Sequence, residues 1–319
     1  MDSSSAPLSA AAASPATALA PPRAGLAPRT RQLLADYLEL TKPKVQSLLL
    51  LTTITTMYVA GDPSLALVAL TCLGGYLSAG GAGAVNHWFD RDIDARMSRT
   101  ANRPIPAGRV PPGAALAFGC ALAALSFLEL SLAVNVLAAS LSFAGFVGYV
   151  LVYTVILKRR TPQNIVIGGA AGAVPPLVGW AAVRGSVSGT AVLLFFIVFF
   201  WTPPHFWALS LLMKGEYEKV GVPMLPVVRG EAETRRQILL YTVLLYAVTQ
   251  LPYCAGGFGA IYLVASLVLG LGFIAGAVRL YRRGDGPPAV ARRAALQLYL
   301  FSLAYLALLF CAMVADRHI

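Results

Sequence analysis

LALVALTCLGGYLSAGGAGAVNHWFDRDID spans residues 65–94 and places a row of polar side chains directly after a long apolar segment. Within it, Asn86, Asp90 and Asp94 recur at intervals of four. Four residues advance an α-helix by about 400°, so these three side chains form a ladder along one helix face, whereas Asp92 points elsewhere. Carboxylates crowded beside a bilayer are costly unless a cation joins them. The ladder therefore predicts a bound cation, and a divalent metal with a phosphorylated ligand is the simplest candidate.

The composition indicates a membrane protein. The 319 residues are 57% hydrophobic and only 12% charged, with a mean hydropathy of +0.69, which is too apolar for a soluble domain of this size. Apolar runs of about 20 residues predict nine membrane-spanning helices, so the expected fold class is an all-α polytopic membrane protein. The predicted helices cover residues 45–60, 65–85, 114–130, 132–157, 163–183, 189–213, 237–255, 258–281 and 294–315.

The distribution of basic residues predicts the orientation. With the N-terminus in the cytoplasm, all of the 25 Lys and Arg residues except Arg184 and Arg317 fall on the cytoplasmic side. This bias explains the net charge of +11, so we expect a lipid bilayer and no nucleic acid among the partners. The expected location is a bacterial plasma membrane, with the mitochondrial inner membrane as the alternative.

Residues 1–32 are rich in Ala, Ser and Pro and are predicted to form a disordered cytoplasmic tail. They contain no continuous apolar segment of the kind found in a secretory signal. Residues 33–319 are predicted to form a single nine-helix membrane domain. The four cysteines are scattered singly, which is typical of small buried hydrophobes and not of a metal or redox motif.

The polar ladder suits magnesium, which usually takes one or two protein carboxylates together with waters and substrate phosphate oxygens. We therefore assign Asn86, Asp90 and Asp94 as metal-binding and catalytic residues. Glu216, in the second polar loop KGEYEK, is the candidate for a further metal contact. The alternative interpretation of the ladder is a solvated loop of mixed charge, because Arg91 and Arg96 lie beside it. The candidates for binding the remaining phosphate charge are basic residues near the two loops, namely Arg99, Arg103, Lys158, Arg159 and Lys214.

Four stretches of the chain resemble one known family. They read NHWFDRDIDARMSRTANRPIPAGR at 86–109, YTVILKRRTPQNIVIGG at 153–169, WTPPHFWAL at 201–209 and GVPMLPVV at 221–228. Together they resemble the protohaem IX farnesyltransferases (haem O synthases) of the UbiA prenyltransferase superfamily, over roughly residues 33–315. The ladder alone would indicate only the superfamily, whereas four stretches in the same order are specific.

The resemblance implies a nine-helix UbiA-type bundle that binds farnesyl diphosphate through Mg²⁺ at its cytoplasmic face. It implies that a vinyl group of haem b accepts the farnesyl group, which gives haem O and releases diphosphate. Asn86, Asp90 and Asp94 match the first metal-diphosphate motif, and Glu216 falls where the second acidic motif begins. Gly215 stands where relatives often carry an acid, so the number of metal ions is left open. Haem A synthase or terminal oxidase assembly factors are the implied protein partners.

Two histidines lie near these stretches, and a histidine within a membrane segment is a functional candidate. His87 follows Asn86, and His205 lies in the TPPHFW stretch. For both we consider a contact to haem or to a cation. A hydrogen bond to a neighbouring helix is the alternative role for His205.

Two other functions fit parts of the sequence. The first is a prenyltransferase of the same fold that acts on another acceptor, such as an aromatic acid in quinone synthesis. The second is a cation-coupled transporter. Pro175-Pro176 favours this function, because it predicts a broken helix of the kind that transporters use. The charges of the ladder lie at one edge of a helix and not near the bilayer midplane, which favours the enzyme.

Overall fold

The computed structural model describes residues 26–319. Most of the predicted tail, residues 1–25, lies outside the described part. The last residues of the predicted tail, 26–32, belong to the helix α1 (Leu26–Leu40). The predicted boundary at residue 32 therefore falls inside a helix. The division of the chain into a tail and a domain otherwise stays a prediction.

All nine predicted spans coincide with a helix or with two helices in succession. Eight of these are long and apolar enough to cross a membrane. The other, α2 (Pro43–Ala60), is only 18 residues long, and its first turn contains the polar residues Lys44 and Gln46. The remaining spans are α3 (Leu65–Phe89), α5 (Pro112–Ala133), α6 (Val136–Val147) with the π-helix η1 (Gly148–Leu157), α7 (Asn164–Gly172) with α8 (Pro175–Arg184), α9 (Gly189–Leu212), α12 (Gly230–Cys254), α13 (Ala260–Arg283) and α14 (Pro288–His318).

Two interruptions have local causes. The break between the predicted spans 114–130 and 132–157 lies at 134–135, where the Asn135 side chain accepts a hydrogen bond from the Ala138 backbone N–H at 2.8 Å and begins α6. The other break separates α7 from α8 at Ala173 and Val174, directly before Pro175 and Pro176. Proline lacks the N–H that a helix interior requires and is tolerated in the first turn, so a new helix begins there.

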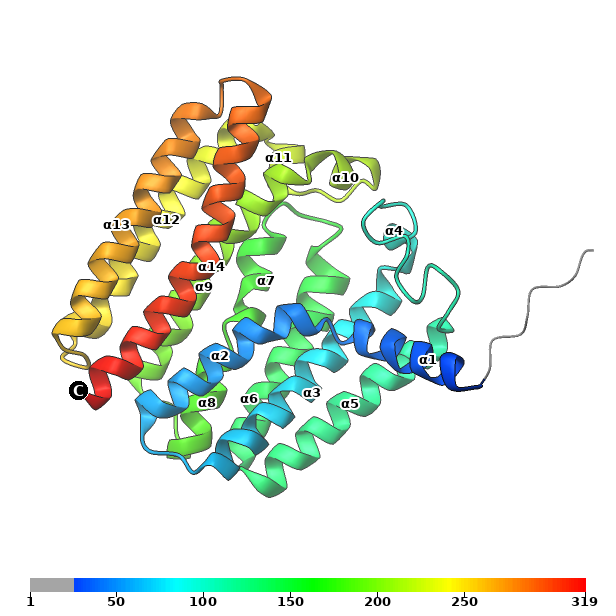
Figure 1. The fold of residues 1–319 in the computed structure, drawn as a ribbon, viewed down its shortest axis with the longest axis horizontal. Coiled ribbons are helices and arrows are strands. Elements are labelled where there is room, and N and C mark those ends of the chain that lie inside the picture. The colour runs from blue at the N-terminus through cyan, green and yellow to red at the C-terminus, as the bar shows by residue number, and fades with distance from the viewer. Residues whose placement is uncertain (1–25) are drawn as a thin grey trace, which may run out of the picture.

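The helices form two groups joined at the centre (Figure 1). On one side α3 packs against α5, and α5 against α6; on the other α12, α13 and α14 pack in succession. Helix α9 contacts α12 and α14, and α2 joins the two groups by packing on α3 of the first and on α14 of the second. The short helices α4 (Arg91–Asp94), α10 (Lys214–Lys219) and α11 (Leu225–Val228) lie at the same end of the bundle. We call this end the loop end.

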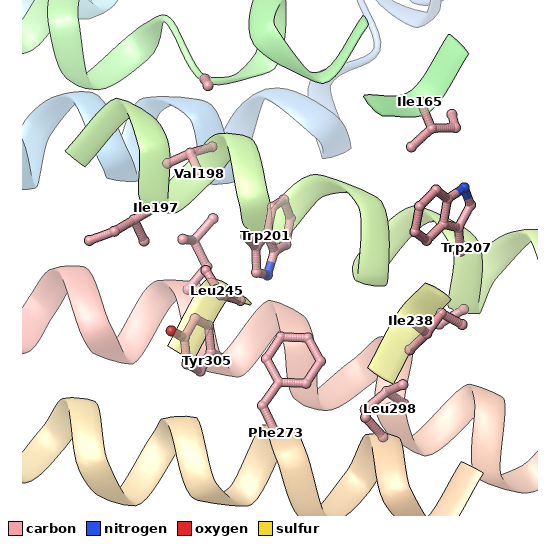
Figure 2. Packing of buried hydrophobic residues seen from close by; sticks show 14 of the residues in the cluster. Ile165, Ile197, Val198, Trp201, Trp207, Ile238, Leu245, Phe273, Leu298 and Tyr305 are labelled. Carbon is pink, nitrogen blue, oxygen red and sulfur yellow. The ribbon is translucent and has the colours of Figure 1, made fainter. Parts of the chain in front are cut away.

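The largest apolar core lies where α9 meets α12, α13 and α14. Figure 2 shows Trp201 of α9, Phe273 of α13 and Tyr305 of α14 filling the space between these helices. The Phe273 and Tyr305 ring centroids lie 5.2 Å apart, and the Trp201 indole N–H donates to the Ser302 carbonyl oxygen at 2.8 Å. This core holds the second group of helices together beside the loop end.

Helices α3 and α5 cross closely because glycines meet at their contact. A Cβ atom added at Gly81 would lie 2.6 Å from the carbonyl oxygen of Gly119, and one at Gly119 would lie 2.7 Å from Val85 Cγ2. Without side chains at the crossing the two backbones pack directly, as small residues allow in membrane helices. The crossing lies just over one helical turn before Asn86, so it also fixes the position of the ladder.

We expect Gly81→Ala to destabilise the purified protein by about 1–3 kcal/mol, because the added methyl group must separate two backbones. Gly75→Ala is the matched control on the same helix, since a Cβ atom there meets nothing within 4 Å. Thermal unfolding in detergent measures both. Equal unfolding temperatures for the two variants would contradict a tight crossing at Gly81.

Candidate active site

The ladder exists in the structure because backbone hydrogen bonding continues through the end of α3. The Asp90 N–H donates to the Asn86 carbonyl oxygen at 2.9 Å, and the Asp94 N–H donates to that of Asp90 at 2.8 Å. The helical spacing therefore persists from α3 into α4, as the sequence predicted. Asn86, Asp90 and Asp94 are all less than 5% exposed, whereas the side chain of Asp92 is 53% exposed.

Each buried carboxylate of the ladder is paired with a basic side chain. Asp94 Oδ2 lies 2.8 Å from Arg103 NH1. Asp90 forms an ion pair with Lys158, and its other oxygen lies 3.5 Å from Arg159 NH2. A buried carboxylate without such a partner would be strongly destabilising. The cation that the ladder requires is supplied here by protein side chains.

Asn86 connects the ladder to two other segments. Its amide nitrogen donates to Asp90 Oδ2 at 2.8 Å and to Thr154 Oγ1 at 3.1 Å. Its amide oxygen accepts from Lys42 Nζ at 2.6 Å, and Lys42 Nζ also donates to the Tyr149 hydroxyl oxygen at 3.3 Å. The site therefore joins the start of α2, the end of α3 and the π-helix η1.

Lys42 is a site residue that the sequence assigned only to membrane topology. It is the N-cap of α2 and has a φ of 54°, a left-handed conformation that a residue with a side chain rarely adopts. Burial, together with repulsion from Arg103 and Lys158, lowers the pKa of the Lys42 amine to about 7. No periodicity in the sequence indicates that a lysine before the first span would turn inward, so only the tertiary structure reveals it.

The π-helix η1 is the second feature that the sequence did not indicate. Its wider turn ends where the Lys158 N–H donates to the Tyr153 carbonyl oxygen at 2.8 Å. The turn brings Tyr149, Thr154 and Lys158 to the ladder, and the Tyr149 and Tyr153 ring centroids lie 5.4 Å apart. π-helical turns often occur at functional sites because they change which side chains share a face.

The other predicted phosphate-binding residues differ in their placement. Arg159 contacts Asp92 at 2.7 Å and Asp90 at 3.5 Å. The hydrogen bond between Arg159 and Asp92 lowers the pKa of the Asp92 carboxyl and raises the pKa of the Arg159 guanidinium. Lys214 instead pairs with Glu231 at 3.1 Å. Arg99 is exposed. The structure thus brings Arg103, Lys158 and Arg159 to the ladder, and in this conformation it places the Lys214 amine on Glu231.

Glu216 lies beside the loop that follows the ladder. Its Oε2 accepts from the Ser98 backbone N–H at 2.8 Å, and its Oε1 lies 3.0 Å from Lys219 Nζ. These bonds lower the pKa of the Glu216 carboxyl, with Lys219 as the larger cause. Glu216 therefore ties the α9–α12 connection to the α4–α5 connection, and its role as a metal contact stays a prediction.

The two candidate histidines have different surroundings. His87 is 2% exposed, and neither of its ring nitrogens has a hydrogen-bond partner within residues 26–319. His205 Nδ1 lies 2.7 Å from Ser302 Oγ of α14, and its ring stacks on Trp201 at 4.3 Å. The structure thus shows the interhelical hydrogen bond considered for His205, while the haem or cation contact of either residue stays a prediction.

The metal assignment can be compared with the donor set. Within residues 26–319 no cluster of three or more His, Cys, Asp or Glu side chains is arranged to hold a metal ion by itself. The two buried carboxylates nevertheless fit a magnesium ion that takes its other ligands from water and a phosphorylated substrate, while the Asn86 amide oxygen faces Lys42. The residues present are compatible with a shared metal site and not with an all-protein one.

These features define an integral membrane protein with a buried, charge-dense polar site at one end of an all-helical bundle. The chain belongs to the UbiA prenyltransferase family, whose sequence pattern matches residues 49–303. It is 54% identical over 92% of its length to the Protoheme IX farnesyltransferase of Chloroflexus aurantiacus, of which it spans 49%. It is 53% identical over 89% of its length to the enzyme of the same name from Symbiobacterium thermophilum, of which it spans 95%. The chain thus spans about half the length of the first relative and nearly all of the second.

Solved structures of low identity share the fold. A digeranylgeranylglyceryl phosphate synthase superposes with a TM-score of 0.73 at 20% identity, over 90% of this chain and 99% of its own. A UbiA homologue from Archaeoglobus fulgidus, bound to DMAPP and Mg²⁺, gives a TM-score of 0.62 at 17% identity, over 86% and 99% of the two chains. The predicted UbiA-type helical bundle is therefore confirmed.

We expect Glu216→Ala to increase tryptic cleavage of the 96–99 segment several-fold in folded protein, because the Ser98 N–H loses its acceptor and the two connections separate. Glu218→Ala is the matched control, since Glu218 is exposed two residues further along α10. Limited proteolysis followed by mass spectrometry identifies the cut sites. Unchanged cleavage in Glu216→Ala would show that the tie does not order the loop.

Proposed function

We propose that this protein transfers the farnesyl group of farnesyl diphosphate to a vinyl group of haem b, giving haem O and diphosphate. The observation that carries the proposal is the buried ladder of Asn86, Asp90 and Asp94 with Lys42, Arg103 and Lys158 bonded to it. Relatives with more than half of their aligned residues identical carry the name Protoheme IX farnesyltransferase. The site supports a diphosphate donor, and the choice of acceptor rests on these relatives.

The ladder can exchange its partners when a diphosphate binds. Lys158 and Arg103 now neutralise Asp90 and Asp94. Bound Mg²⁺ would supply positive charge to these carboxylates and stabilise the diphosphate that leaves when the allylic carbon–oxygen bond breaks. Lys158 and Arg103 are then free to donate to phosphate oxygens, as basic side chains commonly do. Mg²⁺ and the diphosphate carry opposite charges, so much of the charge that they would bring to the site cancels.

Aromatic side chains adjoin the same site. Tyr149 accepts from Lys42, and the Tyr153 ring lies beside it. The faces of aromatic rings stabilise cations, and an allylic cation develops as the diphosphate departs. Burying a farnesyl chain at about 0.8 kcal/mol per CH₂ contributes on the order of 10 kcal/mol, so an apolar helix bundle suits the donor.

The surroundings of the protein follow from charge and composition. We propose that it lies in a bacterial plasma membrane with the loop end in the cytoplasm, because Lys and Arg residues gather on that side. Haem A synthase and terminal oxidase assembly factors are the partners we expect to receive the product. Co-purification from native membranes tests that expectation.

We expect Asp90→Asn and Asp94→Asn to lower the rate of haem O formation on the order of 100-fold or more, because each loses a charge that positions the metal and the diphosphate. Asp92→Asn is the matched control and should stay within a few-fold of the parent, since the Asp92 carboxylate reaches the ladder only through Arg159. Membranes supplied with haem b, farnesyl diphosphate and Mg²⁺ provide the assay. Full activity of well-folded Asp90→Asn would refute the ladder assignment.

Chelation of divalent metal should abolish product formation, and added Mg²⁺ should restore it. Mass spectrometry of the extracted pigment identifies the product. If the parent makes no haem O but prenylates an aromatic acid, haem b is not the acceptor, while the assignment of the ladder stands. If activity persists in excess chelator, the metal dependence is wrong.

A further inference from the structure

A second charged site lies at the loop end, where α12 and α13 meet. It is a cavity of about 310 Å³ lined by Ala232, Glu233, Arg235, Arg236, Tyr281, Arg282 and Asp285. Figure 1 shows the turn that joins α13 to α14 at the end of these helices, on the side of the bundle away from α4. None of the lining residues takes part in the ladder, so the cavity requires a separate explanation.

The cavity contains more positive charge than its acids neutralise. Arg235 forms an ion pair with Asp285, and Arg236 Nε lies 3.2 Å from Glu233 Oε2. Within residues 26–319, Arg282 lines the cavity without an ion pair of its own. Arg279 and Arg283 lie beside it at the end of the same helix, α13. A ligand of this cavity should therefore be an anion.

Arg235 provides an independent indication of a ligand. Its side chain is only 6% exposed, and its Nε has no hydrogen-bond partner among the described residues. A buried donor on a charged group that lacks an acceptor is costly, so such a group usually has a hydrogen-bond partner. Arg235 also lines the cavity, so an anion bound there would lie beside a buried guanidinium whose hydrogen bonds are incomplete.

The surroundings of the cavity favour a lipid. Arg236 is followed on the same helix face by Leu240 and Leu244, at intervals of four, and these leucines are 51% and 41% exposed. Arg235 and Arg236 come just before the apolar part of α12, so they lie at the level of the lipid headgroups when the helix spans a bilayer. Acyl chains can then lie along the leucines while the phosphate reaches the arginines.

We propose that this cavity binds the phosphate headgroup of an anionic phospholipid. Basic pockets between membrane helices bind such headgroups. Arg282 and Arg235, which both line the cavity, would bind the phosphate, and the α12 leucines would contact the chains. This site is distinct from the prenyl-transfer site and does not depend on the proposed function.

Native mass spectrometry of the full chain, titrated in detergent with phosphatidylglycerol, tests the proposal. We expect the parent to retain phosphatidylglycerol more strongly than phosphatidylcholine, and Arg282→Gln to bind it about fivefold more weakly, the effect of one basic side chain on an anionic lipid. Arg293→Gln is the matched control, because Arg293 is exposed on α14 outside the cavity lining. It should bind like the parent.

Three results would overturn the proposal. Equal retention of phosphatidylcholine would show that no anion is selected. Parent-like binding by Arg282→Gln would place the lipid elsewhere. Competition by inorganic phosphate at concentrations equal to those of the lipid would show that the acyl chains contribute nothing, so the ligand would be a soluble phosphate.

Discussion

Two carboxylates buried at the end of a membrane helix constrain the rest of this structure. Asp90 and Asp94 are 1% and 4% exposed, and a carboxylate in such a place is stable only beside positive charge. Lys158 and Arg103 meet that need directly, and Lys42 does so through Asn86. The three basic residues come from three different connections between helices. The paths of those connections are therefore tied to the two acids.

The helices around the ladder have the features that this arrangement requires. Gly81 and Gly119 let α3 and α5 approach closely, which leaves the end of α3 inside the bundle and not at its edge. The wider turn of η1 brings Thr154 to Asn86 at 3.1 Å. The close crossing and the π-helix both depart from regular helix geometry, and both lie where they help to position the polar site.

Much of the fold and the centre of the site could be predicted from the sequence because both depend on local patterns. Apolar runs indicated every span, and the four-residue spacing indicated the shared face of Asn86, Asp90 and Asp94. The inward turn of Lys42, the π-helix and the pairing of Lys214 with Glu231 could not be predicted. Each depends on contacts between residues far apart in the chain or on a backbone conformation that its local sequence does not favour. His205 shows the same limit, since its partner Ser302 is 97 residues away.

The contacts of the ladder also allow an order of assembly during synthesis. Every hydrogen bond and ion pair described for the side chains of the ladder joins residues between Lys42 and Arg159. A ribosome that has completed η1 and the few residues after it has thus already made each of those partners. The helices made later, α9 to α14, contribute the large apolar core and the cavity at Arg235. The charge-dense centre can therefore form first, and the second half of the chain closes around a site whose polar groups are already satisfied.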